Sequence, residues 1–481
     1  MRLVANAEPE GGGAPQGLRP FFDGFSKDLE RWRRRSRGYY QDLHRHIRSL
    51  VPEGSSVLEI GCGQGDLLAF LGEKEALGVD FSEEMIRRGR ERFPDLKLSV
   101  MDAERLAPGR TFDVVIMSNL VGYLGDVQAA FERARDAMHD GSRLVITFHN
   151  PLWEAAFGIA RALRLRSPQP IQNWLSPQDL DGLLDLAGFE VVRKGRRCLF
   201  PKGVPLLGPL VNRWVAPLPG VNRLCLTSWL VARRCPRTRR PEASVSIVVP
   251  ARNEKGNIEP LVRRLPAFGK SREVLFIEGG SSDGTREEIE RVIREAGPEP
   301  ALRLLSQDGK GKGDAVRKAF EHATGDVLMI LDADLSVDPE VLPRFYDLLL
   351  EGRADLLHGS RLVYPIEKQS MRLLNIFGNK FFSAAFTWIL GQRFKDTLCG
   401  TKVLWRSDYE RIRANRKVFG DFDPFGDYDL LFGAARLNLK ISEVPVRYRS
   451  RTYGETNISR WRHGWLLLRM CAFAARRFKF V

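Results

Sequence analysis

The stretch VLMILDADLSVD, residues 327–338, decides the fold of the carboxyl-terminal half of the chain. Its opening apolar run, which lacks alternation, predicts a strand buried on both faces, as strands of parallel sheets are. Asp332 and Asp334 follow and, two residues apart in an extended segment, point to the same side. Open α/β sheets bind ligands beyond the carboxyl ends of their strands. We therefore expect this pair to hold Mg²⁺ or Mn²⁺, which favour oxygen ligands and accept phosphate oxygens as the others.

An alternative interpretation treats these aspartates as ordinary loop residues. Asp338, before Pro339 and Glu340, has the position of a helix cap, and we assign it that role. Asp332 and Asp334 would then be solvated turn residues. Because two aspartates one residue apart are common by chance, the metal site depends on the surrounding motifs.

The segments before this stretch also place polar residues where strands end. Residues 245–249 form an apolar strand that leads to Pro250, Asn253 and Glu254. The segment EVLFIEGGSSDGT, residues 273–285, ends its strand at Glu278. The loop DGKGKG, residues 308–313, carries Lys310 and Lys312 at the start of a helix, which suits phosphate oxygens.

Taken in order, these motifs resemble the family 2 glycosyltransferases of the GT-A fold over residues 244–460. Within that family the chain is similar to polyprenyl-phosphate sugar synthases, the dolichyl-phosphate mannose and glucose synthases. The segments that carry this resemblance are GSRLV (359–363), DTLCGTKVLWR (396–406), GDYDLL (426–431) and EVPVRYRSRTYGETNI (443–458).

The resemblance implies a GDP- or UDP-linked sugar donor, a divalent metal and inversion at the anomeric carbon. It assigns roles to the following residues: Pro250, Asn253, Glu254, Glu278, Lys310 and Lys312 to the donor, Asp332 and Asp334 to the metal and diphosphate, Arg361 and Arg451 to donor or acceptor phosphate, and Asp427 and Asp429 to the reacting sugar. An acceptor hydroxyl would need a base, for which Asp427 is our candidate, whereas a phosphate acceptor needs none. Otherwise Asp427 is a solvated loop residue or a helix cap.

The amino-terminal half has its own ligand motif in VLEIGCGQGD, residues 57–66. A strand meets Gly61, Gly63 and Gly65, where the backbone can approach a ligand closely. Asp80 ends the next strand at the spacing expected for an acceptor of ribose hydroxyls. A dinucleotide-binding domain would share these features.

Further segments favour another cofactor: SVMDAERL (99–106), FDVVIMSNLVGYL (112–124), GSRLVITFHN (141–150) and LSPQDLDGLLDLAGFEVVRKG (175–195). Together they resemble the class I S-adenosylmethionine-dependent methyltransferases over roughly residues 40–235. The resemblance implies the following cofactor-binding residues: Glu59, Gly61, Gly63, Gly65, Asp80, Asp102, Ala103 and Asn119. His149 ends the fifth strand and is a candidate base; the alternative is a structural histidine in a loop.

The composition of the whole chain indicates its partners and its compartment. The 481 residues carry a net charge of +15, which favours anionic partners such as phosphorylated substrates, an anionic membrane or nucleic acid. No nucleic-acid-binding module accompanies the charge, so we expect no specific nucleic acid. The six cysteines lack a C-x-x-C pair, which argues against zinc and disulfides and for the cytoplasm. We expect neither a signal peptide nor a membrane span.

Several segments have the composition of surfaces that meet lipid. Residues 371–395 and 459–480 combine aromatic residues with flanking Lys and Arg, which is typical of interfacial helices at an anionic membrane face. Helices packed on the sheet are the alternative. Residues 199–234 are apolar but broken by prolines and arginines, so they could lie on a bilayer or cover the methyl-acceptor pocket. Residues 21–50 are predicted to form a helix, and the basic run 31–37 within it is either a solvated face or a phosphate- or lipid-facing one.

The sequence thus predicts an α/β protein of two Rossmann-like doubly wound domains with amphipathic interfacial helices. We expect a mobile segment over residues 1–20, a methyltransferase over 21–235, a linker over 236–243 and a glycosyltransferase over 244–481. The first hypothesis is a bifunctional enzyme, peripheral at the cytoplasmic membrane face, that uses polyprenyl phosphate or a lipid-linked sugar. The alternative is a glycosyltransferase for a soluble or cell-surface glycan, whose methyltransferase domain modifies the sugar or serves as a cofactor-binding scaffold. A homo-oligomer is compatible with both.

Overall fold

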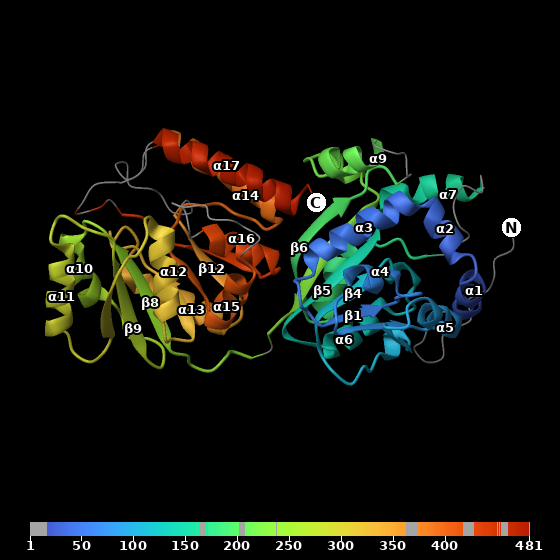
Figure 1. The fold of residues 1–481 in the computed structure, drawn as a ribbon, viewed down its shortest axis with the longest axis horizontal. Coiled ribbons are helices and arrows are strands. Elements are labelled where there is room, and N and C mark those ends of the chain that lie inside the picture. The colour runs from blue at the N-terminus through green and yellow to red at the C-terminus, as the bar shows by residue number, and fades with distance from the viewer. Residues whose placement is uncertain are drawn as a thin grey trace. The chain divides into compact units, whose positions relative to one another are not determined.

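The chain folds into two compact units, one formed by Met1–Cys235 with Lys479–Val481 and the other by Pro236–Phe478. The structure is a computed structural model that describes residues 17–162, 170, 172–201, 207–236, 238–361, 373–416, 428–449, 451, 453 and 460–480. Each unit is built on its own seven-stranded sheet (Figure 1). The prediction of two doubly wound α/β folds is therefore confirmed.

The sheet of the amino-terminal unit has the strand order β3-β2-β1-β4-β5-β7-β6. Its strands are β1 (Val57–Ile60), β2 (Ala76–Asp80), β3 (Lys97–Val100), β4 (Phe112–Ser118), β5 (Met138–His149), β6 (Phe189–Arg197) and β7 (Thr227–Arg234). The first five strands are parallel, and β7 runs antiparallel to both of its neighbours. The carboxyl ends of β1, β2 and β4 therefore meet at one edge.

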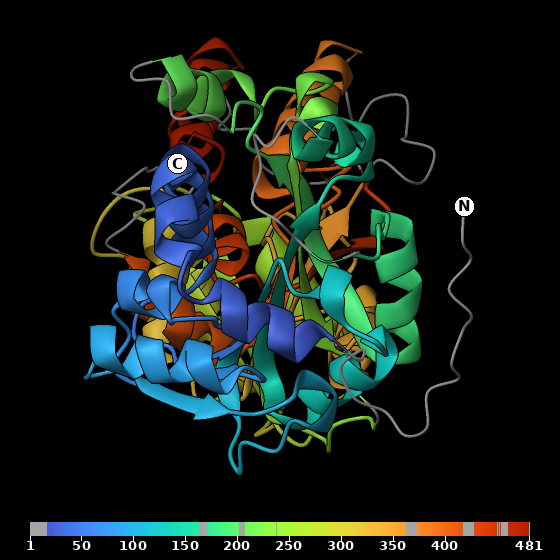
Figure 2. The ribbon, with the colours of Figure 1, turned by 90° about the vertical axis from the view of Figure 1, so that its right-hand side faces the viewer.

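Helices cover both faces of this sheet (Figure 2). They are α1 (Leu18–Phe25), α2 (Leu29–Arg35), α3 (Arg37–Leu50), α4 (Asp66–Leu71), α5 (Glu83–Arg92), α6 (Val127–Asp136), α7 (Glu154–Ala162), α8 (Pro177–Leu186) and α9 (Leu207–Leu210). Side chains of α6 and α8 pack on one face, and those of α3, α4 and α5 pack on the other. Residues 21–50, predicted as one helix, are divided between α1, α2 and α3, and α1 begins within the segment expected to be mobile.

Strand β7 corrects the prediction for residues 199–234. Residues 227–233 are buried in the sheet, so this part of the segment neither lies on a bilayer nor covers a pocket. The prolines that suggested an irregular surface segment come before Thr227 and leave the strand unbroken. Arg233 is buried, and its charge is paired with Glu190 of β6, with 3.0 Å between Nη2 and Oε2.

The sheet of the carboxyl-terminal unit has the order β10-β9-β8-β11-β13-β12-β14. Its strands are β8 (Val245–Ala251), β9 (Arg272–Glu278), β10 (Ala301–Ser306), β11 (Val327–Ile330), β12 (Leu356–Ser360), β13 (Lys402–Trp405) and β14 (Ile441–Pro445). Every residue of β11 is buried, as its apolar sequence predicts. Strand β11 is parallel to β8 and antiparallel to β13, so the carboxyl ends of β8, β9 and β11 share one edge.

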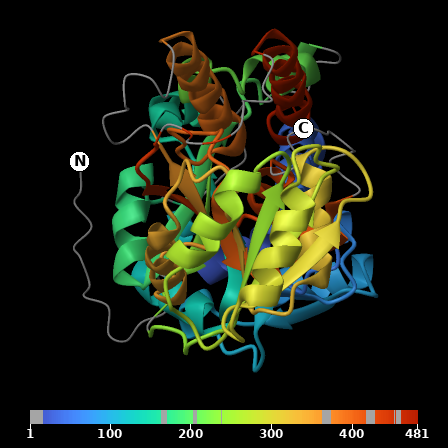
Figure 3. The same cartoon turned by 90° about the vertical axis from the view of Figure 1, so that its left-hand side faces the viewer.

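Helices also surround this second sheet (Figure 3). They are α10 (Lys255–Arg264), α11 (Thr285–Glu295), α12 (Lys312–His322), α13 (Leu342–Leu350), α14 (Leu373–Leu390), α15 (Arg406–Ala414), α16 (Tyr428–Arg436) and α17 (Arg460–Phe478). Helices α14 and α17 pack against each other. Phe381 of α14 and Trp465 and Leu468 of α17 are exposed to solvent. Within the described ranges, no helix has the length and apolar character needed to cross a membrane.

The predicted linker is fixed to the carboxyl-terminal unit. The N–H of Arg240 donates to the carbonyl of Leu350 at 2.9 Å, and the N–H of Ala243 donates to the Tyr346 hydroxyl at 2.7 Å. Just before it lies Cys235, the last residue of the first unit before the chain crosses over. None of the six cysteines forms a disulfide, and Cys235 alone among them is not buried.

Candidate functional site

The glycine loop of the amino-terminal unit joins β1 to α4. Gly61, Gly63 and Gly65 have φ values of 74°, 56° and 82°, which only glycine adopts without strain. The N–H of Gly63 donates to Oδ2 of Asp80 at 2.8 Å, and the N–H of Ser82 donates to Oδ1 at 2.9 Å. Burial raises the pKa of Asp80 to about 6. The structure therefore brings the predicted loop and the predicted ribose acceptor into direct contact.

Glu59 lies beside this loop on β1 and is buried. Burial raises its pKa to about 8, the nearby Arg33 lowers it, and Asp80 raises it further. Within the described residues Oε2 of Glu59 has no hydrogen-bond partner. A buried acceptor without a donor is costly unless a ligand supplies one, so this position fits a ligand with an ammonium or hydroxyl group.

Arg33 is a residue of this site that the sequence did not single out from its basic run. Its guanidinium pairs with Asp66 and lies 5.5 Å from the centroid of the Tyr40 ring. A Cβ on Gly63 would lie 3.8 Å from Nη2 of Arg33. Arg34 and Arg35 of the same helix are exposed. The run of like residues gave no signal to distinguish the one that turns inward.

Asn119 directly follows strand β4, and His149 is the last residue of the neighbouring strand β5. Asn119 has a φ of 54°, and its Nδ2 donates to the Tyr39 hydroxyl at 2.9 Å. The imidazole of His149 is stacked on the Tyr39 ring at 6.3 Å and lies 5.2 Å from the Phe157 ring. The structure thus joins these two predicted residues through Tyr39, which was not predicted.

Asp102 and Ala103 lie beyond β3, where adenine was expected. The Asp102 carboxylate accepts the N–H of Glu104 at 2.9 Å, and Ala103 is buried. Their roles in binding adenine stay predictions.

In the second unit, Asp332 and Asp334 follow β11 as expected, and each pairs with a cation of the chain. Asp332 pairs with Lys312, the first residue of α12. Asp334 pairs with Arg451, with 2.7 Å between Oδ2 and Nη2, and its Oδ1 accepts the N–H of Ser336 at 2.9 Å. The two aspartates thus meet two of the residues predicted to bind phosphate.

Glu254 and Glu278 lie after β8 and at the end of β9. Glu254 accepts a hydrogen bond from Nδ2 of Asn257 at 2.7 Å, and Nη1 of Arg451 lies 3.8 Å from its Oε1. Burial raises the pKa of Glu254 to about 7, Asn257 lowers it, and the Asp334 charge raises it. Glu278 accepts the N–H of Ser281, which closes the glycine/serine turn.

Asn253 connects the loops after β8 and β9. It has a φ of 57°; its N–H donates to Ser281 Oγ at 3.0 Å, and its Oδ1 accepts the N–H of Ser282 at 2.9 Å. Pro250 lies within β8, and Lys310 is exposed in the loop before α12. The predicted donor residues other than Arg361 thus gather at one edge of the sheet, although Lys310 contributes no described contact.

Two predicted residues have other surroundings. Arg361 forms a bidentate pair with Asp396, with distances of 2.7 Å (Nε–Oδ2) and 2.8 Å (Nη2–Oδ1). Oδ2 of Asp429 lies 3.6 Å from Nη1 of Arg317 and 3.6 Å from Nη2 of Arg416. Asp427 lies outside the described residues. Asp338 lies at the N-cap position before Pro339, as predicted, but its side chain makes no cap hydrogen bond and pairs instead with Arg264 and Arg449.

Gly400, within the segment 396–406, packs directly on the paired charges. A Cβ at this position would lie 2.1 Å from Oδ2 of Asp332 and 2.3 Å from Nζ of Lys312. The absence of a side chain therefore makes room for both groups. Sequence reasoning missed this residue because Gly400 is far from both of them along the chain.

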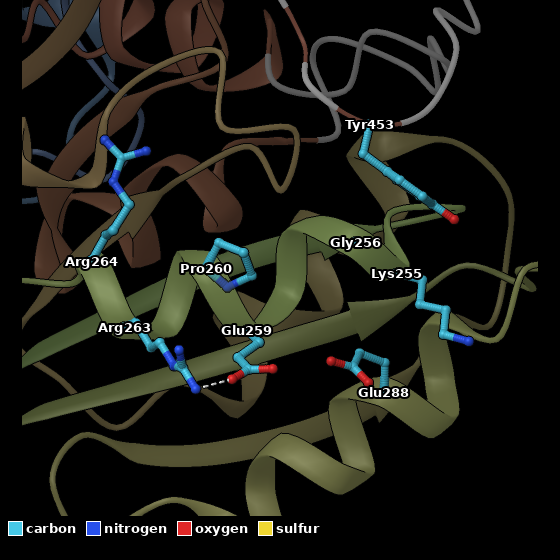
Figure 4. A pocket seen from close by; sticks show the side chains of 8 residues that line it. All are labelled: Lys255, Gly256, Glu259, Pro260, Arg263, Arg264, Glu288 and Tyr453. Atoms are coloured by element: carbon cyan, nitrogen blue, oxygen red, sulfur yellow. Dashed lines mark ion pairs between the residues drawn. The ribbon is translucent and has the colours of Figure 1, made fainter.

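No group of three or more His, Cys, Asp and Glu side chains able to hold a metal occurs in the part of the chain that the structure describes. A divalent ion at Asp332 and Asp334 would therefore need further ligands from water or from a phosphorylated substrate. A pocket of about 690 Å³ lies beside helix α10 and is lined by Gly256 and Tyr453 among others (Figure 4). The aspartates after β11 do not line it.

Comparisons with known proteins agree with the division into two units. A model of glycosyl transferase family 2 matches residues 246–413, and a methyltransferase domain model matches residues 31–194. Glycosyltransferase AglJ of Haloferax volcanii is 31% identical over 229 residues, which are 47% of this chain and 70% of that protein. Glycosyltransferase AglD of the same organism is 29% identical over 235 residues, 46% of this chain and 36% of that protein.

A third relative is the undecaprenyl-phosphate 4-deoxy-4-formamido-L-arabinose transferase of an Enterobacter species. It is 36% identical over 137 residues, which are 27% of this chain and 42% of that protein. The chain thus spans most of AglJ but less than half of the other two relatives. Together with the carboxylates beyond β11, these matches show that the chain belongs to the family 2 glycosyltransferases and carries a methyltransferase domain in its amino-terminal half.

Proposed function

We propose that this protein transfers a sugar from a GDP- or UDP-linked donor to a polyprenyl phosphate or lipid-linked sugar, and methylates with S-adenosylmethionine. The observation that carries the proposal is the gathering of Glu254, Glu278, Asp332 and Asp334 with Lys312 and Arg451 at one sheet edge. Carboxylates suit a metal and the hydroxyls of a nucleotide, and cations suit its phosphates.

In this proposal Asp332 and Asp334 hold Mg²⁺ or Mn²⁺ together with donor oxygens. The metal, when bound, neutralises the charge that develops on the departing nucleoside diphosphate. Glu254 and Glu278 accept hydrogen bonds from the nucleotide, and Lys312 and Arg451 bind its phosphates. One displacement from the opposite face inverts the anomeric carbon.

A phosphate acceptor is supported by two observations. The name of the Enterobacter relative gives its substrate as undecaprenyl phosphate. In this chain Arg317 and Arg416 each place a guanidinium nitrogen 3.6 Å from Oδ2 of Asp429, so cationic side chains that suit a phosphate gather here. An acceptor that is already anionic does not require a base.

Attachment to an anionic membrane face fits such an acceptor. Trp465 and Leu468 are exposed on α17, and Arg469, Arg476 and Arg477 are exposed on the same helix. Aromatic and apolar side chains beside basic ones are typical of helices that lie in the membrane interface. The helix would bring the active site to the headgroup of the lipid acceptor.

For methyl transfer, the glycine loop and Asp80 bind the methionine and ribose parts of S-adenosylmethionine. The unpartnered Oε2 of Glu59 supports this assignment, because it offers a buried acceptor beside the loop. Asp102 and Ala103 flank the adenine, and Asn119 and His149 face the methyl acceptor. His149 removes a proton if that acceptor is a hydroxyl.

The test is direct incubation of the purified chain with Mn²⁺, labelled UDP- and GDP-sugars and a short polyprenyl phosphate. We expect label to enter the organic phase in the wild type and not in Asp332→Asn. Transfer that needs only water-soluble acceptors would contradict the lipid assignment. A second incubation adds labelled S-adenosylmethionine to the same product, and Gly63→Val, which blocks the loop, is the control for methylation.

A further inference from the structure

The pair of aspartates after β11 is neutralised by the chain itself. Lys312 pairs with Asp332, and Arg451 pairs with Asp334 while its second terminal nitrogen lies 3.8 Å from Glu254. The side chain of Asp334 is 7% exposed, so its contact with the guanidinium is largely shielded from water. Two side-chain cations thus pair with the two carboxylates that bind the metal in the proposed function.

Arg451 is held in this place through Tyr453. The Tyr453 ring lies against Gly256, where a Cβ would be 2.7 Å from Cδ2 of the ring. Its hydroxyl donates to Oδ2 of Asp283 at 3.1 Å, and the same oxygen accepts the N–H of Lys255 at 3.2 Å. Tyr453 comes two residues after Arg451 in the sequence. Anchoring the Tyr453 ring therefore restricts where the Arg451 side chain can lie.

We propose that Arg451 is a resident cation of the metal site, that Tyr453 is its positioning residue, and that the metal–nucleotide complex exchanges with it. This proposal rests on the proposed function of Asp332 and Asp334. On exchange, the guanidinium leaves Asp334 and pairs with the donor diphosphate. No bond is made or broken in the exchange; only ionic contacts change partners.

The charges explain why metal and donor should bind together. A divalent ion alone must displace Arg451 from Asp334, and the guanidinium then loses its 2.7 Å contact with a carboxylate in a partly buried place, which is unfavourable. When the ion arrives with a diphosphate, the displaced guanidinium gains a bidentate phosphate contact. The pocket lined by Gly256 and Tyr453 gives the ring open space beside helix α10 (Figure 4).

The direction in which Arg451→Gln changes the affinity for Mn²⁺ separates this proposal from a purely structural role of Arg451. If Arg451 only orients Asp334, Arg451→Gln weakens Mn²⁺ binding. If Arg451 is the resident cation, the same variant removes a competitor and strengthens it. Electron paramagnetic resonance measures the concentration of free Mn²⁺, without turnover, in the presence and absence of UDP or GDP.

We expect Arg451→Gln to bind Mn²⁺ alone about tenfold more tightly than the wild type, and Mn²⁺ with UDP or GDP more weakly. Arg449→Gln is the matched control: it removes the same charge two residues away, from an arginine that pairs with Asp338. It should bind Mn²⁺ like the wild type. Equal or weaker binding of Mn²⁺ alone by Arg451→Gln overturns the proposal.

Two further variants test the positioning residue without altering a charge. Gly256→Ala pushes the ring away from α10, and Tyr453→Phe keeps the ring contact but loses the bond to Asp283. Both should tighten binding of Mn²⁺ alone, Gly256→Ala the more of the two, whereas unchanged binding in both overturns the role of Tyr453.

If wild-type protein binds neither Mn²⁺ nor Mn²⁺ with UDP or GDP, the proposed function fails and this inference fails with it. Binding of Mn²⁺ with nucleotide, with no tightening in Arg451→Gln, overturns the inference alone.

Discussion

Arg361 and Asp396 form a buried bidentate ion pair, with side-chain exposures of 11% and 0%. The N–H of Arg361 also donates to Oδ2 of Asp396 at 3.0 Å, so the carboxylate ties the end of β12 to the segment before β13. Burial disfavours the charged guanidinium, but Asp396 outweighs it and raises the pKa of Arg361. The arginine of the GSRLV motif therefore supports the fold in this structure.

Asp396→Asn should destabilise the carboxyl-terminal unit by about 3–5 kcal/mol, because it leaves a buried guanidinium without its counter-charge. Urea denaturation of the full chain, followed by the transition of that unit, measures the loss. The control is Asp347→Asn, which breaks the exposed pair with Arg239 and should cost less than about 1 kcal/mol. Equal effects of the two changes would contradict the structural role of Arg361.

Asp332→Asn should lower sugar transfer at least about 100-fold, because removing a group that stabilises transition-state charge costs that much in comparable sites. The stability of the unit should change little, since Lys312 and Asp332 are partly exposed. The assay is release of UDP or GDP in the presence of polyprenyl phosphate. Asp338→Asn, which removes a carboxylate that pairs with Arg264 and Arg449, should keep its activity.

Gly400→Ala should reduce sugar transfer about tenfold or more while the protein stays folded. The added Cβ would occupy the place of the Asp332 carboxylate and the Lys312 ammonium, so these groups must move. Circular dichroism checks the fold, and donor turnover checks the site. Gly378→Ala in α14, where a Cβ would meet nothing within 4 Å, is the matched control. Full activity in Gly400→Ala would remove this glycine from the site.

The stability of the amino-terminal unit should depend on the ionisation of Glu59. Its pKa is about 8 in the folded chain against 4.5 when unfolded, so the folded state retains a proton that the unfolded state releases. The stabilisation is fully present below about pH 4.5 and is lost as pH rises through 8, at up to about 1.4 kcal/mol per pH unit. Urea denaturation between pH 5 and pH 9 measures this slope.

Glu59→Gln cannot ionise and should remove that slope. Glu53→Gln, at an exposed position of the same unit, should keep it. A wild type and a Glu59→Gln variant with the same pH profile would show that Glu59 ionises as it does in water.

Trp465→Ser combined with Leu468→Ser should reduce flotation of the protein with anionic liposomes severalfold at low salt. Both side chains are exposed on α17 and would enter the interface, where each buried apolar group contributes. Leu186→Ser, at a position 69% exposed in the amino-terminal unit, is the control and should float like the wild type. Unchanged flotation of the double variant would place the membrane contact elsewhere.

The parts of this fold that sequence predicts are those encoded by a local pattern. The apolar run before Asp332 is strand β11, and the residues before Gly61 are strand β1. Strand β7 was missed because its partners are distant in sequence. Arg233 interrupts the apolar pattern, and Glu190, which makes its burial possible, comes from another strand.

The same reason explains the helix that was predicted as one and found as three. Ser26, which follows α1, is buried, and its hydroxyl donates to the carbonyl of Asp23 at 2.7 Å. Its own carbonyl accepts Nε2 of Gln64 at 2.9 Å. A tertiary contact with the glycine loop therefore accompanies the break, and helix propensity alone does not contain it.

At the site, residue type predicts the chemistry but not the partner. The motifs predict the acids and lysines that follow the strands. They do not predict that Asp396 and Gly400 contact residues far away along the chain. Tyr453 was part of a recognised segment, but its contact with Gly256 depends on how that segment meets helix α10.

Cys235, the one thiol of six that is not buried, comes directly before Pro236, where the first unit ends. A maleimide dye should therefore modify native protein mainly at this residue. A fluorophore there reports on the chain segment that joins the two units without any engineered cysteine. Its anisotropy, followed as each proposed substrate is added, would show whether ligand binding in either unit changes the mobility of this segment.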